Sequence, residues 1–455
     1  MGGAKMKLDM AGTGAQRKKP FALLREICAE GDWKCLLSAF IWGAGCFCYR
    51  QWIKGAIYLL LEAAFILFFV FFGGEALVGF FTLGVQEANP WFGIEGDNSI
   101  TMLIWGIFAI IMIVVAVMVA WASVKSTYYA QCRVKKGEKP ETFRQTLANL
   151  LDKNFYKTAL FLPVISVCVF NILPIVFMIL IAFTNYGGDI VPPKLVDWIG
   201  LANFVKLFNL SEFSSTLFKI LEWNVMWAVM ATALTYFGGL GLALLYNKKC
   251  VKARGFFRIF PVLAYALPGF ITMLGFKFMF SYGGPINYYI TEAGGSAVGF
   301  LDIDAGWNAR LVGLFVSGWM SIPSFMLYCS GILSNMNQDI HEAAIIDGAS
   351  AFKRFIYLTL PFVIFATTPI LISSFIGNFN NFGVFFFLRG GLYVDGYFLA
   401  SDTDLLINWL YNLSISNNYY AIGAAISLVI FLFTSTVSLV VYILSPSYRK
   451  EETYQ

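Results

Sequence analysis

Residues 101–122 read TMLIWGIFAIIMIVVAVMVAWA, without one charged side chain, and seven further stretches of this chain are similarly long and apolar, with at most one charged side chain each. An α-helix needs about 20 apolar residues to cross the roughly 30 Å hydrocarbon core of a bilayer. The strands of a membrane β-barrel would instead show as alternating segments of about ten residues. The pattern therefore predicts an all-α integral membrane protein.

The predicted crossings number about eight. They are Gly55–Phe72, Thr101–Ala122, Leu160–Phe183, Val225–Tyr246, Ile259–Phe280, Leu311–Leu333, Phe362–Phe382 and Ala421–Leu444. An earlier apolar run, Leu36–Tyr49, is too short to cross and contains Gly43 and Gly45. We expect this run to be an interfacial or re-entrant segment on the cytoplasmic side.

Composition excludes a soluble protein of this size. Of the 455 residues, 58% are hydrophobic, 18% aromatic and only 13% charged, which is too little polar material to cover a soluble surface. Lys and Arg are kept in the cytoplasm near the ends of membrane helices. With eight crossings and both termini in the cytoplasm, 26 of the 32 Lys and Arg residues fall on the cytoplasmic side. The sequence thus predicts a multi-pass protein of the cytoplasmic membrane, and the net charge of +5 gives no reason to expect a nucleic-acid partner.

Three parts follow one another along the chain. Residues 1–54 form a basic cytoplasmic lead, and residues 55–157 form an accessory unit of two helices with a basic inner loop. Residues 158–455 hold the remaining six crossings and a long inner loop at residues 339–361. Prolines lie inside several crossings, where each removes a backbone hydrogen bond and loosens the helix: Pro163, Pro174, Pro261, Pro268, Pro323 and Pro369.

The inner loop, residues 339–361, reads DIHEAAIIDGASAFKRFIYLTLP. We expect two short helices: Asp339 can cap the first, Gly348 can end it in a left-handed conformation, and Ser350 can begin the second. Pro361 marks the start of the next crossing. From the residues alone, a loop that docks a partner and a structured loop without a partner are equally good interpretations.

The spacing Glu342-Ala343-Ala344, Gly348 and Leu360-Pro361 resembles the signature loop of permease subunits of type I ABC importers. The resemblance implies a coupling helix that fits a cleft on an ATPase, with Glu342, Ala343, Ala344 and Gly348 as the contacting residues. It also implies three partners: a second, MalG-like permease, a homodimeric cytoplasmic ABC ATPase and an extracellular lipid-anchored sugar-binding protein. ATP and Mg²⁺ would be used by the ATPase, so this chain would bind no cofactor.

Two further segments, Phe260–Gly269 and Ser374–Phe382, resemble MalF-type maltose and maltodextrin permeases, in the compact form found in Gram-positive bacteria. That resemblance implies a sugar site at Tyr265, Ser374, Asn378 and Asn381. Amides and hydroxyls offer the donors and acceptors that sugar hydroxyls need. Asn378 and Asn381 are three residues apart, so we expect them to share one helix face. From the residues alone, bonds to a neighbouring helix are a slightly better interpretation of these amides than a sugar site.

The resemblance is incomplete at the sugar site. Gly269 and Gly377 stand where the well-known member has a serine and a phenylalanine, and Ser317 and Ser324 replace larger groups. The cavity is therefore expected to be wider, or to select a different oligosaccharide or glycoside.

Two other classes of membrane protein fit the sequence less well. An ion-coupled transporter usually buries ionisable residues in its crossings, and here only Glu62 and Lys277 qualify, the latter near a helix end. An enzyme would need a cluster of catalytic groups, and none is found; the single histidine, His341, lies in the inner loop. There is no G-x-x-x-x-G-K-[ST] phosphate loop, so any ATP chemistry belongs to a partner.

Overall fold

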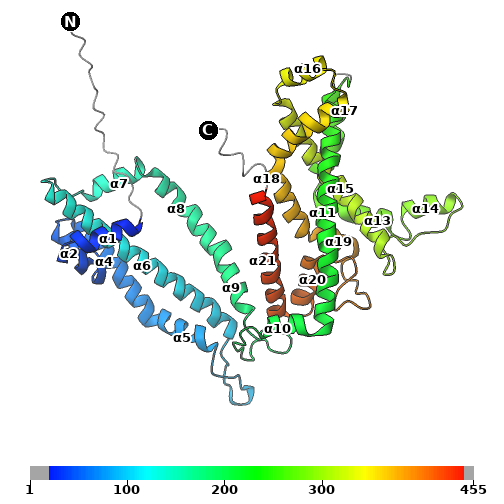
Figure 1. Cartoon of the computed structure of the whole chain (residues 1–455). Coiled ribbons are helices and arrows are strands. Elements are labelled where there is room, and N and C mark those ends of the chain that lie inside the picture. The colour runs from blue at the N-terminus through cyan, green and yellow to red at the C-terminus, as the bar shows by residue number, and fades with distance from the viewer. Residues whose placement is uncertain (1–19, 249–250, 445–455) are drawn as a thin grey trace, which may run out of the picture. The chain divides into compact units, whose positions relative to one another are not determined.

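The computed structural model describes residues 20–248 and 251–444, which contain helices and connecting loops but no β-strand (Figure 1). The chain divides by its contacts into two compact units. Unit 1 is Met1–Phe177 with Pro192–Val196, and unit 2 is Met178–Val191 with Asp197–Gln455. The start of the basic lead, up to residue 19, and the terminal pair Arg449 and Lys450 lie outside the described residues. The functional boundary placed at residue 157 stays a prediction.

The helices follow the chain in this order. The first part contains α1 (Pro20–Glu30), α2 (Trp33–Phe40), α3 (Ala44–Cys48), α4 (Trp52–Phe68), η1 (Phe69–Gly73), α5 (Gly74–Thr82), η2 (Pro90–Phe92), α6 (Ser99–Lys135), α7 (Phe143–Leu151), α8 (Phe155–Val167), η3 (Cys168–Ile172) and α9 (Leu173–Ile181). Then come α10 (Ala202–Asn209), α11 (Ser211–Asn247), α12 (Arg254–Ala266), α13 (Gly269–Phe280), α14 (Pro285–Glu292), α15 (Gly306–Ser334), α16 (Gln338–Ile346), α17 (Ala351–Arg354), η4 (Phe355–Thr359), α18 (Leu360–Phe379), α19 (Gly383–Arg389), α20 (Leu406–Tyr411), η5 (Asn412–Ser416) and α21 (Tyr420–Leu444).

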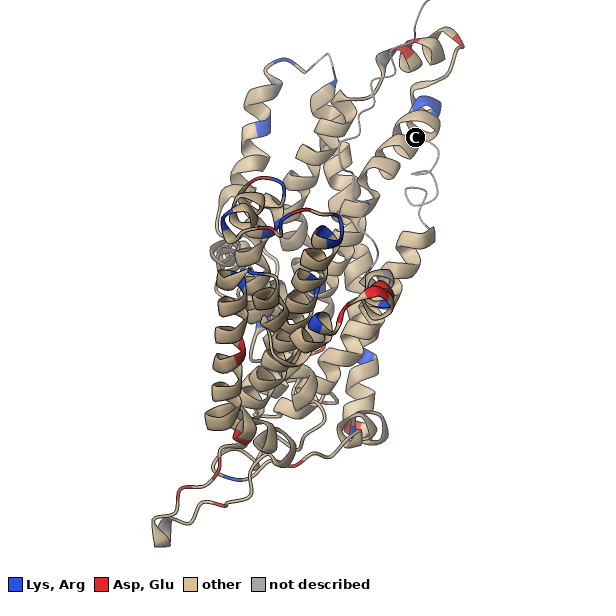
Figure 2. Ribbon diagram, turned by 90° about the vertical axis from the view of Figure 1, so that its left-hand side faces the viewer, with Lys and Arg blue, Asp and Glu red and all other residues tan. Residues whose placement is uncertain are grey.

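Seven of the predicted crossings correspond to helices long and apolar enough to span a membrane. Their ribbons are mostly uncharged in Figure 2, with charged residues mainly at helix ends and in loops. The remaining predicted crossing, over Ile259–Phe280, is not one continuous helix. That run is a bent pair, Gly255–Ala266 and Gly269–Glu292, with an angle of 92° between them. Pro268 forces Leu267 out of the helical region, and Leu267 is indeed extended at φ −76° and ψ 142°.

Two prolines in unbroken helices are accommodated differently. Pro174 follows the π-helix η3, and Pro361 follows the π-helix η4. A proline ring clashes with the carbonyl four residues earlier, and those carbonyls, of Phe170 and Tyr357, lie within the π segments. The wider π turn gives the ring room. Pro361 therefore lies inside a continuous helical run, not at the start of a new helix.

In unit 1, the Leu36–Tyr49 run forms the end of α2 and the short α3, neither of which is long enough to cross a membrane. Both helices pack on α6. Glu62, on α4, accepts a hydrogen bond of 2.8 Å from the backbone N–H of Trp42 in the turn between them. The Glu62 carboxylate, although within a predicted crossing, therefore has a structural partner.

The core of unit 2 is built around α11, which packs against α15 and α18. Trp227, Val316 and Phe385 are fully buried where α11, α15 and α19 meet. The backbones of α11 and α15 come very close, because a Cβ atom at Gly239 would lie 2.8 Å from the backbone nitrogen of Met326. Small residues permit such close packing between membrane helices.

The seventh crossing is interrupted between α18 and α19, at residues 380–382. An interruption leaves carbonyl groups without partners in their own helix. The Asn224 side chain, on α11, donates to the Phe379 carbonyl at 3.0 Å, and the Asn408 side chain, on α20, donates to the Phe382 carbonyl at 2.8 Å. Asn224 also accepts from the Leu406 backbone N–H at 2.9 Å. The Asn224 amide therefore satisfies the end of α18, while the Phe382 carbonyl also accepts from the Phe386 N–H of α19 at 3.4 Å. The two asparagines join the break to α11 and α20.

We expect Asn224→Ala to destabilise the protein, because it leaves a buried carbonyl and a buried N–H unpaired at about 1–3 kcal/mol each. The measurement is the thermal midpoint of the purified protein. Asn380→Ala is the matched control: this exposed asparagine lies at the same break and bonds only to the Ile376 carbonyl of its own helix. Equal midpoints for the two variants would contradict this account of the break.

Candidate functional site

The predicted coupling loop forms two helices at one end of unit 2, α16 and α17 (Figure 1). The prediction that Asp339 caps the first helix was wrong. Asn337 is the cap, and its side chain accepts from the Asp339 backbone N–H at 2.9 Å. An acidic residue in the first turn, where Asp339 lies, still suits the positive end of the helix dipole.

The turn after α16 follows the sequence prediction. Gly348 has φ +77°, the left-handed conformation that favours glycine, and Ser350 caps α17 by accepting from the Lys353 N–H at 3.3 Å. The Arg354 side chain donates to the Ala349 carbonyl at 2.7 Å and fixes the turn. Beyond it, α17, η4 and α18 form one helical run from Ala351 to Phe379.

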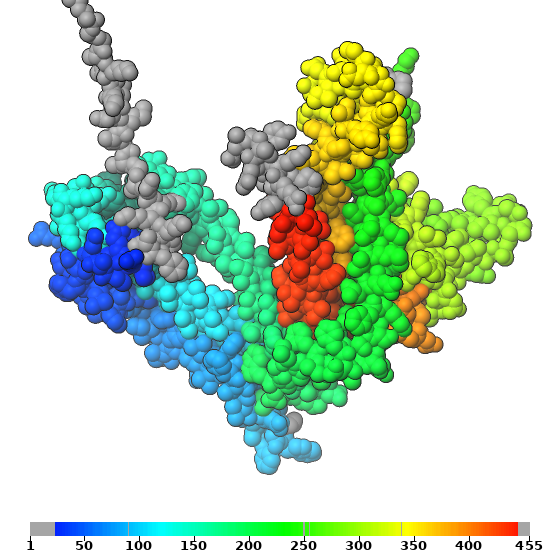
Figure 3. Space-filling view, in the orientation of Figure 1, coloured from blue at the N-terminus to red at the C-terminus, as the bar shows by residue number. Residues whose placement is uncertain are grey.

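The loop presents an uncovered surface. Glu342, Ala343 and Gly348 are exposed and Ala344 is half-buried. The large apolar side chains Ile346 and Phe352 are 86% and 73% exposed. In Figure 3 this segment, in yellow, stands out at its end of unit 2. Exposed apolar groups of this size beside small residues indicate a protein-docking surface.

We expect Gly348→Val to reduce transport roughly tenfold, since a β-branched residue in the left-handed region costs about 1–2 kcal/mol. There is free space around Gly348, so the effect comes from the backbone and not from a clash. Asn tolerates this conformation, and Gly348→Asn should retain most activity. Equal loss in both variants, at equal membrane levels, would mean that backbone conformation does not matter here.

The four predicted sugar-site residues lie on three segments of unit 2. Tyr265 lies on α12, is 59% exposed, and its hydroxyl makes no hydrogen bond to the described residues. Ser374 and Asn378 lie on α18, and Asn381 lies in the link to α19. The helical run carrying Ser374 and Asn378 begins at Ala351, well before the apolar segment. No hydrogen bond in the described structure joins Tyr265 to the other three residues.

Asn378 and Asn381 do not share one helix face, contrary to the sequence prediction, because α18 ends at Phe379. Asn378 is buried and donates to the Thr232 hydroxyl of α11 at 3.0 Å. The Asn381 side chain accepts from the Val384 backbone N–H at 3.2 Å and so helps to begin α19. Both amides thus have structural partners, and each keeps capacity for a further hydrogen bond.

Two glycines where the sequence departs from the MalF type have different surroundings. A Cβ atom at Gly377, on α18, would meet no atom within 4 Å, so the space beside α18 is open there. A Cβ atom at Gly269 would lie 2.9 Å from the methyl group of Met320. The wider cavity stays a prediction, with open space at Gly377 and a close neighbour at Gly269.

Sequence reasoning missed a buried polar cluster in the loop between α19 and α20. Arg389, with a fully buried side chain, donates to the Asp402 carboxylate at 2.8 Å and to the carbonyls of Asp302 and Ile303. Asp404 accepts from the Ser401 N–H at 2.9 Å and from the Asn412 side chain at 3.1 Å. Arg389 and its partners Asp302 and Ile303 lie far apart in the sequence, so only tertiary contacts reveal the structural role of this loop.

Burial raises the pKa of Asp404 from 3.8 to about 7, although its hydrogen bonds and the nearby Arg389 charge act in the opposite direction. A carboxyl with a raised pKa binds a proton on folding, so its contribution to stability is present below pH 4 and is lost as the pH rises to 7. We expect this group to lower the thermal midpoint as the pH rises from about 4 to about 7. Asp404→Asn should flatten this part of the pH dependence.

Asp395→Asn serves as the control for that prediction, because Asp395 is exposed in the same loop. The comparison requires thermal midpoints of all three proteins over the same pH series. An identical pH dependence in the wild type and in Asp404→Asn would show that Asp404 does not titrate in this range.

Comparisons with known proteins show which family this chain resembles. Residues 236–450 match the family described as binding-protein-dependent transport system inner membrane component. The chain is 32% identical to the galactooligosaccharides transport system permease protein GanP of Bacillus subtilis, over 91% of this chain and 98% of that protein. It is 30% identical to the maltodextrin transport system permease protein MalC of Streptococcus pneumoniae, over 90% of this chain and 95% of that protein.

This chain belongs to the family of inner membrane components of binding-protein-dependent transport systems. The same fold occurs in a bacterial ABC transporter involved in the import of the acidic polysaccharide alginate: the TM-score is 0.54 at 18% identity, covering 65% of this chain and 97% of that one. The predicted all-α permease fold and the resemblance to maltodextrin permeases are confirmed. The protein is a membrane subunit of a transport system and not an enzyme.

Proposed function

We propose that this chain is the permease subunit of an ATP-driven importer that carries maltose and maltodextrin-type oligosaccharides across the cytoplasmic membrane. The observation that supports this best is similarity over nine tenths of the chain to permeases named for neutral oligosaccharides. The side chains at the proposed site agree with it, because Tyr265, Ser374, Asn378 and Asn381 supply hydroxyls and amides and no ionised group.

The proposed assembly contains a second, MalG-like permease, a homodimeric ABC ATPase and an extracellular lipid-anchored sugar-binding protein. A solved alginate transporter in complex with its pentasaccharide-bound periplasmic protein gives a precedent for such an assembly. In the proposed orientation both termini and α16 face the cytoplasm, in keeping with the Lys and Arg distribution. Glu342, Ala343, Ala344 and Gly348 would contact the ATPase, which would use ATP and Mg²⁺.

In the proposed cycle, closure of the ATPase on ATP displaces α16. The helical run from Ala351 to Phe379 leads directly from this loop to Ser374 and Asn378. Movement at one end therefore reaches these two side chains of the proposed sugar site without crossing a flexible loop. The cavity would then change from inward-facing to outward-facing and receive sugar from the binding protein.

Uptake of radiolabelled maltotriose by cells that express the whole system tests this proposal. Glu342→Lys should abolish uptake while the protein still reaches the membrane. Asn378→Ala should raise the KM for uptake roughly 3- to 10-fold, which corresponds to one hydrogen bond to a neutral group. Thr232→Val is the matched control, because it removes the interhelical partner of Asn378 and leaves the amide in place.

Each result bears on a different part of the proposal. If both variants raise KM equally, Asn378 acts by holding α18 to α11 and not by binding sugar. If the wild type ignores maltotriose but takes up a galactooligosaccharide, the second candidate substrate, suggested by the similarity to GanP, replaces the first. Uptake that does not depend on the ATPase would contradict the importer itself.

A further inference from the structure

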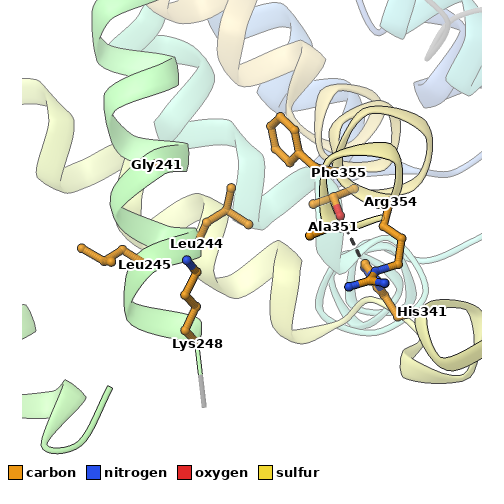
Figure 4. Close-up of a pocket in the computed structure, with 9 residues that line it drawn as sticks. Gly241, Leu244, Leu245, Lys248, His341, Ala351, Arg354 and Phe355 are labelled. Atoms are coloured by element: carbon orange, nitrogen blue, oxygen red, sulfur yellow. Dashed lines mark hydrogen bonds between the residues drawn. The ribbon is translucent and has the colours of Figure 1, made fainter. Parts of the chain in front are cut away.

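A pocket of about 550 Å³ lies beside the coupling loop, within unit 2. Three segments form its wall: the last turns of α11, the helix α16, and the helical run through α17 and η4. Its lining residues are Gly241, Leu244, Leu245, Lys248, His341, Ala351, Arg354, Phe355 and Thr359. In Figure 4, Arg354 and His341 lie together across from α11, and Lys248 extends from the end of α11.

The pocket carries positive charge that no lining carboxylate balances. Lys248 and Arg354 supply two positive charges, and no carboxylate is among the lining residues. Within the described part of the chain, neither side chain forms an ion pair. Arg354 uses one nitrogen to bond the Ala349 carbonyl, which holds its guanidinium in place, and its other N–H groups remain for a ligand. The His341 ring lies 3.4 Å from the Thr359 hydroxyl.

The other side of the pocket is apolar. Leu244 and Phe355 lie beside the same space, whereas the Leu245 side chain, 48% exposed, extends to the other side of α11 in Figure 4. Lys248 directly follows α11 and lies two residues beyond the predicted crossing Val225–Tyr246, so we expect it near the lipid head groups. Basic pockets between membrane helices on the cytoplasmic side bind phosphate-bearing lipid head groups, because the cations meet the phosphate while the apolar wall meets the chains.

We propose that this pocket binds a phosphate group, with Lys248 and Arg354 as its charged ligands, and that an anionic phospholipid of the inner leaflet supplies it. The lipid source rests on the proposed orientation, whereas the phosphate site does not. Because the wall includes both α16 and η4, an occupant touches the coupling loop and the start of the helical run at once. The lipid would therefore brace this run against the end of α11.

Native mass spectrometry of the complex with its co-expressed partner subunits tests the proposal. The complex is titrated with phosphatidylglycerol, and in parallel with zwitterionic phosphatidylcholine. The wild type should retain phosphatidylglycerol preferentially. Each basic residue near a membrane surface contributes about fivefold, so Lys248→Gln should weaken apparent binding about fivefold and Lys248→Gln with Arg354→Gln about 30-fold.

The control carries the same charge change outside the pocket. Lys252→Gln with Lys353→Gln removes two exposed lysines from the neighbouring segments, neither of which lines the pocket. This variant should keep phosphatidylglycerol. If Arg354→Gln prevents assembly, because Arg354 also fixes the loop turn, the fivefold effect of Lys248→Gln alone decides the question.

Three other results have defined meanings. Equal lipid retention in the pocket and control variants would overturn the proposal. Loss of the ATPase subunit, with lipid retention unchanged, would also overturn it and identify an acidic side chain of the partner as the occupant. If inorganic phosphate instead raises the thermal midpoint of the wild type but not of the double variant, and phosphatidylglycerol is not retained, the phosphate site stands with free phosphate as its source. None of these measurements uses sugar, so failure of maltotriose uptake leaves the proposal intact.

Discussion

A carbonyl group left without a partner inside a membrane-spanning helix is expensive, and unit 2 is organised around the place where this chain interrupts such a helix. Between α18 and α19 the carbonyls of Phe379 and Phe382 receive hydrogen bonds from Asn224 and Asn408. The amides come from α11 and α20, so the break can exist only with those two helices in place. The same requirement explains why α11, the centre of the packing, carries an asparagine at this depth.

This break also fixes where a substrate could meet the helix. Asn378 lies in the last turn of α18 and Asn381 lies in the link, so the two side chains flank the irregular backbone and do not share one helix face. Irregular backbone at membrane depth is tolerated where it is buried in protein or lines a water-filled cavity. The open space beside Gly377 agrees with the second condition, and the buried bond from Asn378 to Thr232 agrees with the first.

The sequence was sufficient for features that depend on local chemistry. Seven crossings could be predicted from apolar length, and the turn at Gly348 from the conformational freedom of glycine. It was insufficient where tertiary contacts decide. The helices on either side of Pro268 meet at 92°, whereas the helix continues through Pro361 because the π-helix η4 precedes it. Whether a proline bends a helix depends on whether the preceding turn can widen and on what packs around it. Asn337 displaced Asp339 as the cap, and the polar cluster around Arg389 joins residues too distant in sequence to be paired by inspection.

The two ends of the seventh crossing are held very differently. At one end, Arg389 is fully buried and donates to the side chains of Asp402 and Thr403. It also donates to the backbone carbonyls of Asp302 and Ile303. Breaking such a buried charge network costs several kcal/mol, so this end is fixed. At the other end, the loop of α16 and α17 is largely exposed and has only light contacts with the helical run, such as the Arg354 bond to Ala349 and the His341 contact with Thr359. The firm anchor at Arg389 therefore lies on α19, beyond the break at residues 380–382, whereas the run from Ala351 to Phe379 is lightly held at its α16 end. In the proposed cycle, a force on α16 would move the first residues of this run most.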